Sequence, residues 1–517
     1  MEVLFIVGSN TKETHPVIAN RMIEARRHGA KIVIADPRRV PMVRFADLHL
    51  QLKPGTDAAL LNGIAHVMLK EQLYDADFVD RNTSDFEEWR TSVEPFTPEA
   101  VSAITGVPSE SILAAARIYG GSRKAGIFYT MGITQHSSGT DNVRAIANLA
   151  LLSGNIGRPH TGVNPLRGQN NVQGASDAAA LPDVLPGYQK IEVPENRAKF
   201  EQAWGVPLSS RSGLTSTEMI PAALRGDIKA LYVMGENPVI TDPNASHTIE
   251  ALKALDFLVV QDIFLTETAK LADVVLPAAC FAEKDGTFTN TERKVQRVRK
   301  AVCAPGAARD DLSILLELSE RLGIALHFTD SASAFAEFSA LWPALTGVSY
   351  ERLEGGGIQW PCPDAAHPGT PYLYAQGFPK GKAPFSRIPH IPPAETADEA
   401  YPFVLTTGRN LFQYHTGSMT RRVQPIELHA GTPYVEINAM DAARLGIADG
   451  DAVTVASRRG EISIAVRITP RVEEGIVFIP MHYREAAANL LTSDALDRVT
   501  KTPEFKVCAV KIEAGKK

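Results

Sequence analysis

The feature that most constrains the fold of this chain is a pattern that occurs twice. In its first copy, the apolar residues of the stretch LFIVGSN are followed by Gly8, and the apolar residues of a second stretch, KIVIADPRR, are followed by Asp36. In its second copy, LYVMGENP runs into Gly235 and FLVVQDIF runs into Asp262. The glycine and the aspartate are 28 residues apart in the first copy and 27 in the second. This repeated spacing indicates two copies of one supersecondary unit.

Each copy is predicted to be a strand–helix–strand unit with parallel strands, because such crossovers are right-handed and compact. In the first copy, Thr14 is expected to cap the helix and Gly29 to end it. Another aspartate follows eleven residues after each copy, at Asp47 and at Asp273. Parallel sheets bind ligands at the carboxyl ends of their strands, with phosphates near helix N-termini. The repeat therefore predicts two similar nucleotide ligands, or two halves of one large ligand.

An alternative interpretation of the repeat is that both copies are only scaffolding, in which Asp36 and Asp262 cap turns. The turn at Gly8 is not G-x-G-x-x-G, so the usual dinucleotide-binding fingerprint is absent. A polar asparagine follows the glycine in both copies, at Asn10 and Asn237. Scaffolding alone does not require this asparagine, so its recurrence favours the ligand-binding interpretation.

The rest of the sequence predicts an α/β chain that ends in a separate β-domain. Residues 57–120 carry apolar residues at helical spacing. From about 355 to 402 the composition shifts to Pro, Gly and Ala, which is typical of an extended linker. Stretches such as DAVTVASRRG and EISIAVRIT then alternate as strands do. The predicted domains are a first α/β domain at 1–168, a second at 169–354, the linker at 355–402 and a compact β-barrel-like domain at 403–517.

Composition excludes several classes of protein. With 517 residues the chain exceeds a single core, so about three domains are expected. The net charge of −6 argues against a nucleic-acid partner. No apolar run approaches the roughly 20 residues of a membrane span, and no signal peptide is visible. We therefore expect a cytoplasmic protein without direct membrane insertion. The four cysteines, Cys280, Cys303, Cys362 and Cys508, form no C-x-x-C pair, so this chain alone is not expected to ligate a cysteine-bound cluster.

The segment NPLRGQNNVQG, residues 164–174, gathers five amide side chains around Arg167. This segment and the motifs GSNTKETHP, ADPRR, KPGTD, MGITQ, MGENP, QDIF, TGRNLFQYHTGSMTRR and TKTPEFKVCAV resemble the molybdopterin oxidoreductase family, most closely formate dehydrogenase catalytic subunits. The resemblance covers essentially the whole chain in the family's order. It is most specific over GNIGRPHTGVNPLRGQNNVQG, where nitrate reductases differ more than elsewhere.

The resemblance implies a molybdenum or tungsten ion held by two molybdopterin guanine dinucleotides. This cofactor would account for the repeat, since each of two Rossmann-like dinucleotide-binding domains would hold one dinucleotide. A C-terminal β-barrel of the double-psi type would close over both. The amide cluster would meet the donors and acceptors of a pterin edge without adding buried charge. The alternative is that this segment is a solvated polar loop.

The residues to which the resemblance assigns cofactor contacts all lie in the matched motifs. They are Gly8, Ser9, Asn10 and His15 at phosphates, Asp36, Arg38, Gly55, Thr56 and Asp57 at the nucleoside end, Met131, Gln135, Gln169, Asn170 and Gln173 near the pterin, Gly235, Asn237, Gln261 and Asp262 at the second dinucleotide, and Thr407, Gly408, Arg409, His415, Thr416, Asn489 and Lys506 as capping or further contacts. Taken singly, His415 and His482 are more simply interpreted as histidines whose hydrogen bonds are satisfied within the fold.

Arg167 resembles the substrate arginine of the family. A guanidinium fork fits a carboxylate bidentately, and formate is little more than a carboxylate. Holding formate there would position its C–H bond for oxidation. The alternative is a structural, phosphate-binding arginine.

Formate dehydrogenases of this family also carry an N-terminal domain with a 4Fe–4S cluster, followed by a metal-ligating cysteine or selenocysteine. None of the four cysteines here has a matching context, so no metal ligand is assigned, and the cluster is expected only outside this chain. Three explanations stay open: a gene product interrupted at a selenocysteine codon, a natural split subunit, or a relic that lost the chemistry. We expect the isolated chain to be inactive and its partner to be an iron–sulfur polypeptide or other electron-transfer subunits. Alternative functions are reduction of nitrate or another oxo-anion, and a non-catalytic cofactor-binding or assembly role.

Overall fold

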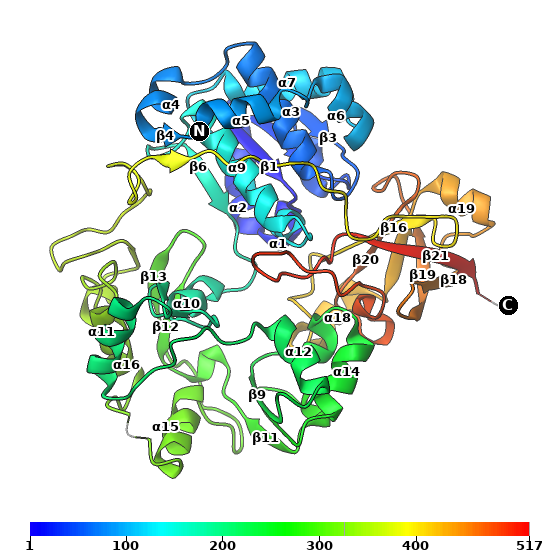
Figure 1. The fold of residues 1–517 in the computed structure, drawn as a ribbon. Helices are drawn as coiled ribbons and strands as arrows, with labels where there is room; N and C mark the ends of the chain where they lie inside the picture. Colours follow the sequence, from blue (N-terminus) through cyan, green and yellow to red (C-terminus); the bar gives the residue numbers. More distant parts are fainter. Residues whose placement is uncertain (325, 516–517) are drawn as a thin grey trace. The chain divides into compact units, whose positions relative to one another are not determined.

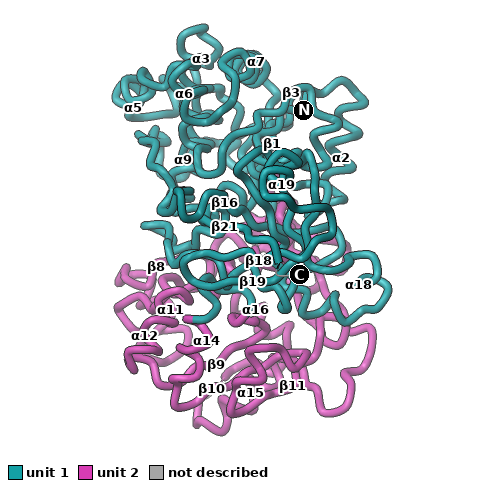
Figure 2. Tube along the Cα trace, turned by 90° about the vertical axis from the view of Figure 1, so that its right-hand side faces the viewer, with its two compact units in different colours: residues 1–166, 240–246, 372–517 teal, residues 167–239, 247–371 magenta. Residues whose placement is uncertain are grey.

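The computed structural model describes residues 1–324 and 326–515. It is a mixed α/β structure with a closed β-barrel in its C-terminal region, as the sequence predicts (Figure 1). The chain forms two compact units (Figure 2). Unit 1 consists of residues 1–166, 240–246 and 372–517, and unit 2 consists of residues 167–239 and 247–371. The domain boundaries drawn from the sequence stay a prediction.

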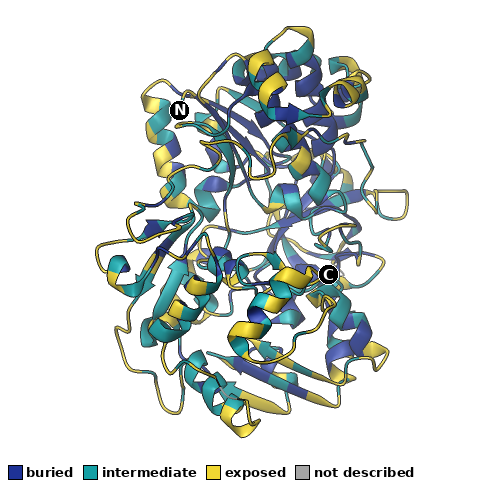
Figure 3. Cartoon of the chain, turned by 60° about the vertical axis from the view of Figure 1, so that its left-hand side comes forward, coloured by how far each residue is buried: buried dark blue, intermediate teal, exposed yellow. Residues whose placement is uncertain are grey.

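Unit 1 contains a five-stranded parallel sheet with the order β3-β2-β1-β5-β6. Its strands are β1 (Val3–Val7), β2 (Lys31–Ala35), β3 (Leu48–Leu50), β5 (Ala125–Tyr129) and β6 (Gly162–Pro165). Every residue of β1 is buried, as expected of a central parallel strand that is covered on both faces (Figure 3). The register pairs Val7 with both Ala35 and Tyr129, so the carboxyl ends of β1, β2 and β5 meet at one edge.

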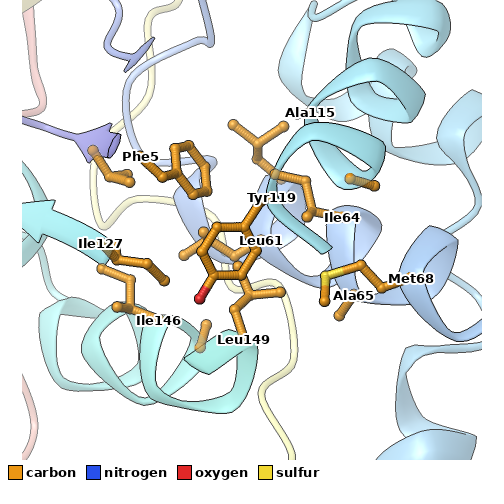
Figure 4. Close-up of a cluster of buried hydrophobic side chains, with 14 of the residues drawn as sticks. Phe5, Leu61, Ile64, Ala65, Met68, Ala115, Tyr119, Ile127, Ile146 and Leu149 are labelled. Atoms are coloured by element: carbon orange, nitrogen blue, oxygen red, sulfur yellow. The ribbon is translucent and has the colours of Figure 1, made fainter. Parts of the chain in front are cut away.

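The main core of unit 1 lies on one face of this sheet (Figure 4). The ring of Tyr119 lies among Leu61, Ile127 and Ile146, and its centroid is 5.8 Å from that of Phe5. The helices of residues 1–166 are α1 (Thr11–Thr14), α2 (Pro16–Arg27), α3 (Asp57–Lys70), α4 (Ala76–Asn82), α5 (Phe86–Val93), α6 (Pro98–Thr105), α7 (Ser109–Gly120), α8 (Met131–Thr134) and α9 (Gly139–Ser153).

The predicted helix cap at Thr14 is wrong. Thr14 ends the separate short helix α1, and its hydroxyl donates to the Asn10 carbonyl oxygen at 3.1 Å. Helix α2 begins at Pro16 after His15, which makes no side-chain capping bond. Proline at the first helical position supplies a suitable φ and has no N–H to satisfy, so this helix start does not depend on a hydroxyl cap.

The closed barrel of unit 1 has the strand order β16-β20-β17-β19-β18-β21. Its strands are β16 (Phe403–Gly408), β17 (Tyr434–Ile437), β18 (Ala452–Ala456), β19 (Glu461–Ile468), β20 (Ile476–Pro480) and β21 (Cys508–Ala514), joined in part by α18 (Gln424–Ala430) and α19 (Ala439–Leu445). Alternate residues such as Leu405, Val453 and Ile479 fill its core, which explains the alternating sequence pattern. Outside the barrel, the short strands β4 (Thr83–Ser84) and β15 (Ala383–Pro384) pair in parallel.

Unit 2 contains a three-stranded parallel sheet, a three-stranded antiparallel sheet and a two-stranded ribbon. The parallel sheet has the order β11-β10-β9, formed by β9 (Ala230–Met234), β10 (Phe257–Asp262) and β11 (Val274–Pro277). The other strands are β12 (Gly286–Thr289), β13 (Lys294–Val298) and β14 (Ile358–Gln359), and β7 (Val184–Leu185) and β8 (Gln189–Lys190). The helices are α10 (Val172–Asp177), α11 (Pro194–Trp204), α12 (Ser216–Leu224), α15 (Asp311–Arg321), α16 (Ser331–Leu341) and α17 (Tyr350–Leu353). Two further helices, α13 (Pro238–Thr241) and α14 (Ala245–Lys253), include residues assigned to both units.

The two copies of the sequence repeat make equivalent hydrogen bonds. The Gly8 amide donates to the Ala35 oxygen at 2.9 Å, and the Gly235 amide donates to the Gln261 oxygen at 2.8 Å. At the third landmark, Asp47 accepts from the Ile32 amide at 2.8 Å, and Asp273 accepts from the Leu258 amide at 2.7 Å. Asp47 and Asp273 therefore have the same structural role, which is to anchor the start of the strand before them.

Among the residues that the structure describes, no helix combines the length and the apolar character that crossing a membrane requires.

Candidate functional site

The predicted phosphate loop of unit 1 packs backbone against backbone at the carboxyl ends of β1 and β5. Gly8 has a φ of 55°, and a Cβ atom there would lie 2.7 Å from the carbonyl carbon of Gly132. The Thr130 hydroxyl donates to the Gly8 carbonyl oxygen at 2.6 Å. Gly235, the equivalent residue of the second copy, has a φ of 64°, but a Cβ atom there would meet no described atom within 4 Å. A side chain is therefore excluded sterically at Gly8, whereas at Gly235 only the backbone conformation favours glycine.

The polar residues that follow Gly8 are partly engaged with one another. Ser9 and Thr11 share a hydrogen bond of 2.8 Å between their hydroxyls, and the His15 ring lies 2.8 Å from the Thr14 hydroxyl. The Asn10 amide nitrogen donates to Glu13 at 2.8 Å. The other end of that amide, Oδ1 of Asn10, is buried and has no hydrogen-bond partner among the described residues. It is an acceptor for which this part of the chain provides no donor.

Two buried carboxyl groups lie beside this loop, on Asp36 at the end of β2 and on Asp57 at the start of α3. Burial raises the pKa of Asp36 to about 6, although the Arg38 amide donates to its Oδ1 at 2.9 Å. Burial also raises the pKa of Asp57 to about 7, and the nearby Asp36 carboxylate adds to that rise. Since burial disfavours the ionised forms, N–H donors on a ligand would stabilise these two carboxylates.

The turn before α3 is tightly fitted. Gly55 has a φ of 83°, and a Cβ atom there would lie 2.3 Å from the ring of Pro393. The Thr56 hydroxyl donates to the Lys53 carbonyl oxygen at 2.7 Å. These contacts fix the position of Asp57, the first residue of α3.

His136 completes this group of acceptors, although no sequence pattern predicted a role for it. Its Nε2 donates to the Gly132 carbonyl oxygen at 2.9 Å, and burial lowers its pKa to about 4, so the ring is neutral. Its Nδ1 is therefore an acceptor; it is buried, has no hydrogen-bond partner among the described residues, and lies 4.0 Å from Oε1 of Glu504. Its Nε2 lies 3.8 Å from Asp57. His136 directly follows the predicted Gln135, and Glu504 lies in the motif that contains Lys506, so proximity to the motifs was the available signal.

Lys506 is held near the Asp36 carboxyl group. Its ammonium group donates to the Thr407 carbonyl oxygen at 2.6 Å, and the Thr407 hydroxyl donates to the Phe505 carbonyl oxygen at 2.8 Å. Burial lowers the pKa of Lys506 to about 8, while attraction to Asp36 opposes that decrease. The predicted residues Asp36, Asp57 and Lys506 thus come together, although they lie far apart in the sequence.

Arg38 connects the end of β2 to the barrel. Its guanidinium donates to the buried Glu436 at 2.6 Å and lies 3.4 Å from the centroid of the Phe478 ring. Its Nε atom is buried without a hydrogen-bond partner among the described residues. Much of this side chain therefore has a structural role, while Nε offers an unmatched donor to a ligand.

The predicted capping residues of the barrel lie at the end of β16 and in the segment that follows it. Gly408 leaves no room for a side chain, since a Cβ atom there would lie 2.8 Å from the Phe478 ring. The Thr416 hydroxyl is 2.8 Å from that of Ser418. Arg409 donates through one terminal nitrogen to the Gln413 oxygen at 3.3 Å, while its buried Nε has no partner among the described residues.

The two histidines near Arg409 are neutral. Burial lowers the pKa of His415 to about 4 and that of His482 to about 3. His482 donates through Nδ1 to the His415 carbonyl oxygen and accepts from the Asn410 amide at 3.0 Å through Nε2. His482 is therefore a histidine whose hydrogen bonds are satisfied within the fold.

Three other predicted contact residues of unit 1 have different settings. Met131 is 48% exposed, and Gln135 is partly buried at the end of α8. The Asn489 amide donates to the carbonyl oxygens of Ile240 and Thr241, at 2.8 and 2.9 Å. The amide nitrogen of Asn489 is thus used to hold the chain itself.

In unit 2, Arg167 belongs to a side-chain network. Its Nε donates to Oε1 of Gln173 at 2.9 Å, and its amide donates to the Thr291 hydroxyl at 3.0 Å. Gln173 is buried, whereas Asn170 is exposed and Gln169 is intermediate. The amides of this segment are therefore not equivalent in burial, and the buried Gln173 accepts from Arg167.

In contrast to Oδ1 of Asn10, the predicted polar side chains of the second repeat have hydrogen-bond partners within the chain. The Asn237 side chain accepts from the amide and the hydroxyl of Thr268, at 3.1 and 2.8 Å. Gln261 donates to Asp311 at 2.6 Å and accepts from the Tyr232 hydroxyl. Asp262 accepts from the Phe264 amide at 3.2 Å, as Asp36 accepts from that of Arg38. Both aspartates therefore cap a turn, as the scaffolding interpretation requires, but of the two only Asp36 is buried.

The residues of unit 1 fit a dinucleotide ligand. Buried acceptors without a donor among the described residues lie on Asn10 and His136, and buried donors without an acceptor lie on Arg38 and Arg409. Burial raises the pKa values of Asp36 and Asp57, so donors on a ligand would stabilise the ionised form of both groups. A guanine base presents N–H donors beside acceptors, and phosphate oxygens accept from guanidinium groups, so this set matches both ends of such a ligand.

Replacing Asp57 by asparagine should stabilise the cofactor-free chain at pH 8. The raised pKa of Asp57 means that the folded chain loses stability as pH rises from about 4 to about 7, at most about 4 kcal/mol. The variant lacks this loss, so its free energy of unfolding should change less between pH 5 and pH 8. Urea unfolding at both pH values measures this, with the exposed Asp77→Asn as control. An unchanged pH dependence in Asp57→Asn would show that the carboxyl group is already compensated.

Comparison with known proteins gives a consistent result over the whole chain. Residues 2–321 match the family described as Molybdopterin oxidoreductase, and residues 403–509 match the Molydopterin dinucleotide binding domain. The chain is 50% identical over 516 residues to the F420-dependent formate dehydrogenase subunit alpha of Methanocaldococcus jannaschii, covering 99% of this chain and 76% of that one. It is 42% identical over 519 residues to formate dehydrogenase H of Escherichia coli, covering 99% and 73%. The structure of acetylene hydratase from Pelobacter acetylenicus has a similar fold, with a TM-score of 0.77, 21% identity, and coverage of 99% and 78%.

Proposed function

This chain belongs to the molybdopterin oxidoreductase family, and on that premise we propose that it oxidises formate to carbon dioxide within a molybdenum or tungsten formate dehydrogenase catalytic subunit. The observation that carries the proposal is 50% identity to a formate dehydrogenase alpha subunit over 99% of this chain. The family and domain matches support a cofactor made of two molybdopterin guanine dinucleotides.

The first dinucleotide is assigned to unit 1. The phosphate loop at Gly8 and the carboxyl groups of Asp36 and Asp57 lie at one sheet edge, and Lys506 reaches the same place from the barrel side. The strand order of this sheet supports a Rossmann-like domain, and the closed barrel supports a double-psi topology. The second dinucleotide is assigned to the equivalent edge of the β9–β11 sheet in unit 2, whose repeat makes the same backbone contacts at Gly235 and Asp273.

In the proposed reaction, Arg167 binds formate. Two parallel N–H donors of a guanidinium group match the two oxygens of a carboxylate, so formate would be held in one orientation. A bound metal–pterin group would supply the acceptor for the two electrons that formate loses when its C–H bond breaks and its proton is released. Those electrons pass to an iron–sulfur or other electron-transfer partner in the cytoplasm.

The proposal is tested with the cofactor-loaded protein, produced together with its electron-transfer partner. We expect molybdenum or tungsten to copurify with the chain and formate to reduce a viologen dye. Nitrate-dependent oxidation of reduced dye without a reaction with formate would instead identify an oxo-anion reductase. Protein that folds with its partner but contains neither metal would indicate a non-catalytic role.

A further inference from the structure

The amide group of Gln173 is hydrogen-bonded at both ends within unit 2. Its Oε1 accepts from Nε of Arg167 at 2.9 Å. Its Nε2 donates to Oδ1 of Asp177 at 2.7 Å and contacts the Tyr188 hydroxyl at 3.0 Å. Since an amide has one acceptor end and one donor end, these bonds also fix which end faces Arg167. Gln173 is therefore a link between the arginine and a second polar group.

That second group, the carboxylate of Asp177, is held from several sides. Only 1% of the residue is exposed. Besides Gln173, it accepts from the Tyr188 hydroxyl at 2.8 Å and, through Oδ2, from the indole N–H of Trp360 at 2.9 Å. The Trp360 ring lies 5.1 Å from the ring of Trp342, measured between centroids. A buried carboxylate that accepts from three donors is held in one position, and the Trp360 donor is itself packed against Trp342.

The backbone near Arg167 is held independently of this network. The Arg167 amide donates to the Thr291 hydroxyl at 3.0 Å. Asn171, which has a φ of 65°, accepts through its side chain from the Thr289 amide at 2.9 Å. These two bonds attach the segment to β12 and the turn that follows it, so removal of the Gln173 amide would leave the backbone anchored.

We propose that Gln173, Asp177 and Tyr188 are positioning residues that fix the plane of the Arg167 guanidinium for a carboxylate substrate. A guanidinium group is planar, so a bond to Nε determines the direction of its other N–H groups. This inference rests on the proposed function, in which Arg167 binds formate. It gives Gln173 a role different from the pterin contact expected from the sequence, because both ends of its amide are already used within the chain.

The first test measures the orientation of the arginine without catalysis. In protein labelled with ¹⁵N-arginine, Arg167 should give an Nε–H signal with slow hydrogen exchange, assigned by its loss in Arg167→Lys. The signal should exchange at least about tenfold faster in Gln173→Leu, since the acceptor is gone. It should change less in Tyr188→Phe, which keeps the bond between Gln173 and Asp177. Unchanged exchange in Gln173→Leu would overturn the inference.

The second test is a double-mutant cycle in the cofactor-loaded protein, using Arg167→Ala, Gln173→Leu and the pair. Gln173→Leu should raise KM for formate by about tenfold, with a smaller decrease in kcat. In the Arg167→Ala background the same change should have no further effect, because the arginine to be positioned is absent. Additive effects would overturn the positioning role and leave formate binding by Arg167 intact. No effect of Arg167→Ala on formate kinetics would overturn both.

Gln189→Leu is the matched control for general destabilisation. The Gln189 amide donates to the carbonyl oxygens of Pro186 and Leu341, at 2.6 and 3.0 Å, so it holds the backbone of unit 2, whereas Gln173 accepts from the Arg167 side chain. It should lower the unfolding temperature as Gln173→Leu does, while the formate KM stays at its original value. Metal content per chain is measured in every variant. An equal rise of KM in Gln189→Leu would show that loosening of unit 2, and not orientation of Arg167, causes the effect.

Discussion

Replacing Arg167 by alanine should lower kcat/KM for formate by about 10²- to 10⁴-fold in the cofactor-loaded protein. A carboxylate held by two charge-assisted hydrogen bonds loses about 1.5–3 kcal/mol for each bond removed. The decrease should be seen in both KM and kcat, since the same bonds bind formate and orient it. Formate-dependent dye reduction over a series of formate concentrations measures both constants.

Two variants sharpen this prediction. Arg167→Lys keeps the positive charge but not the planar guanidinium group. Compared with Arg167→Ala, its KM for formate should therefore be closer to the original value than its kcat is. Arg225→Ala is the control in unit 2, because Arg225 is exposed and pairs with the exposed Asp227. If Arg167→Ala and Arg225→Ala gave the same kinetics, Arg167 would be a structural arginine, as the alternative interpretation of the sequence holds.

Replacing Arg38 by alanine should destabilise unit 1 by about 3–5 kcal/mol. The change leaves Glu436, which is completely buried, without its contact of 2.6 Å, and Arg471 at 3.4 Å is a poorer and more exposed partner. It also removes the guanidinium that lies against the Phe478 ring. Because the pair joins the end of β2 to the barrel, the loss should lower the denaturant midpoint of unfolding.

The control for Arg38 separates loss of packing from an unpaired charge. The double variant Arg38→Met with Glu436→Met replaces the ion pair by apolar side chains and should recover most of the lost stability. Arg21→Ala, at an exposed position on α2, should change the free energy of unfolding by less than about 0.5 kcal/mol. A loss in Arg38→Ala no larger than in Arg21→Ala would mean that Glu436 is compensated by other groups.

The repeat could be predicted from the sequence because it depends on local patterns. Apolar runs that end in Gly8 and Gly235 give strands, and the spacing to Asp36 and Asp262 gives the crossover. The structure adds that the later aspartates anchor the strands, through bonds to the Ile32 and Leu258 amides. The alternating pattern after residue 402 likewise predicted the β-domain, since one face of each strand fills the barrel core.

The partners of the site residues could not be predicted, because they come from distant parts of the chain. Arg38 meets Glu436 across 398 positions, and Glu504 accepts from Ser137 across 367. No periodicity reports such contacts, since they depend on how the barrel packs on the sheet. The hydrogen bonds around Gln173 could not be predicted for a similar reason, because they connect through Asp177 to the distant Trp360. Sequence similarity to a motif assigns a residue to a region, but burial and hydrogen bonding determine what it does there.

The most direct test of formate oxidation by this chain is the fate of [¹³C]formate in the cofactor-loaded protein with its electron-transfer partner. We expect labelled carbon dioxide to form in a fixed ratio to reduced viologen, one molecule for every two dye molecules that each take up one electron. Arg167→Ala should abolish most of this conversion while the metal content is unchanged. Metal-loaded protein that forms no labelled carbon dioxide, but oxidises reduced viologen with nitrate, would contradict the proposed function.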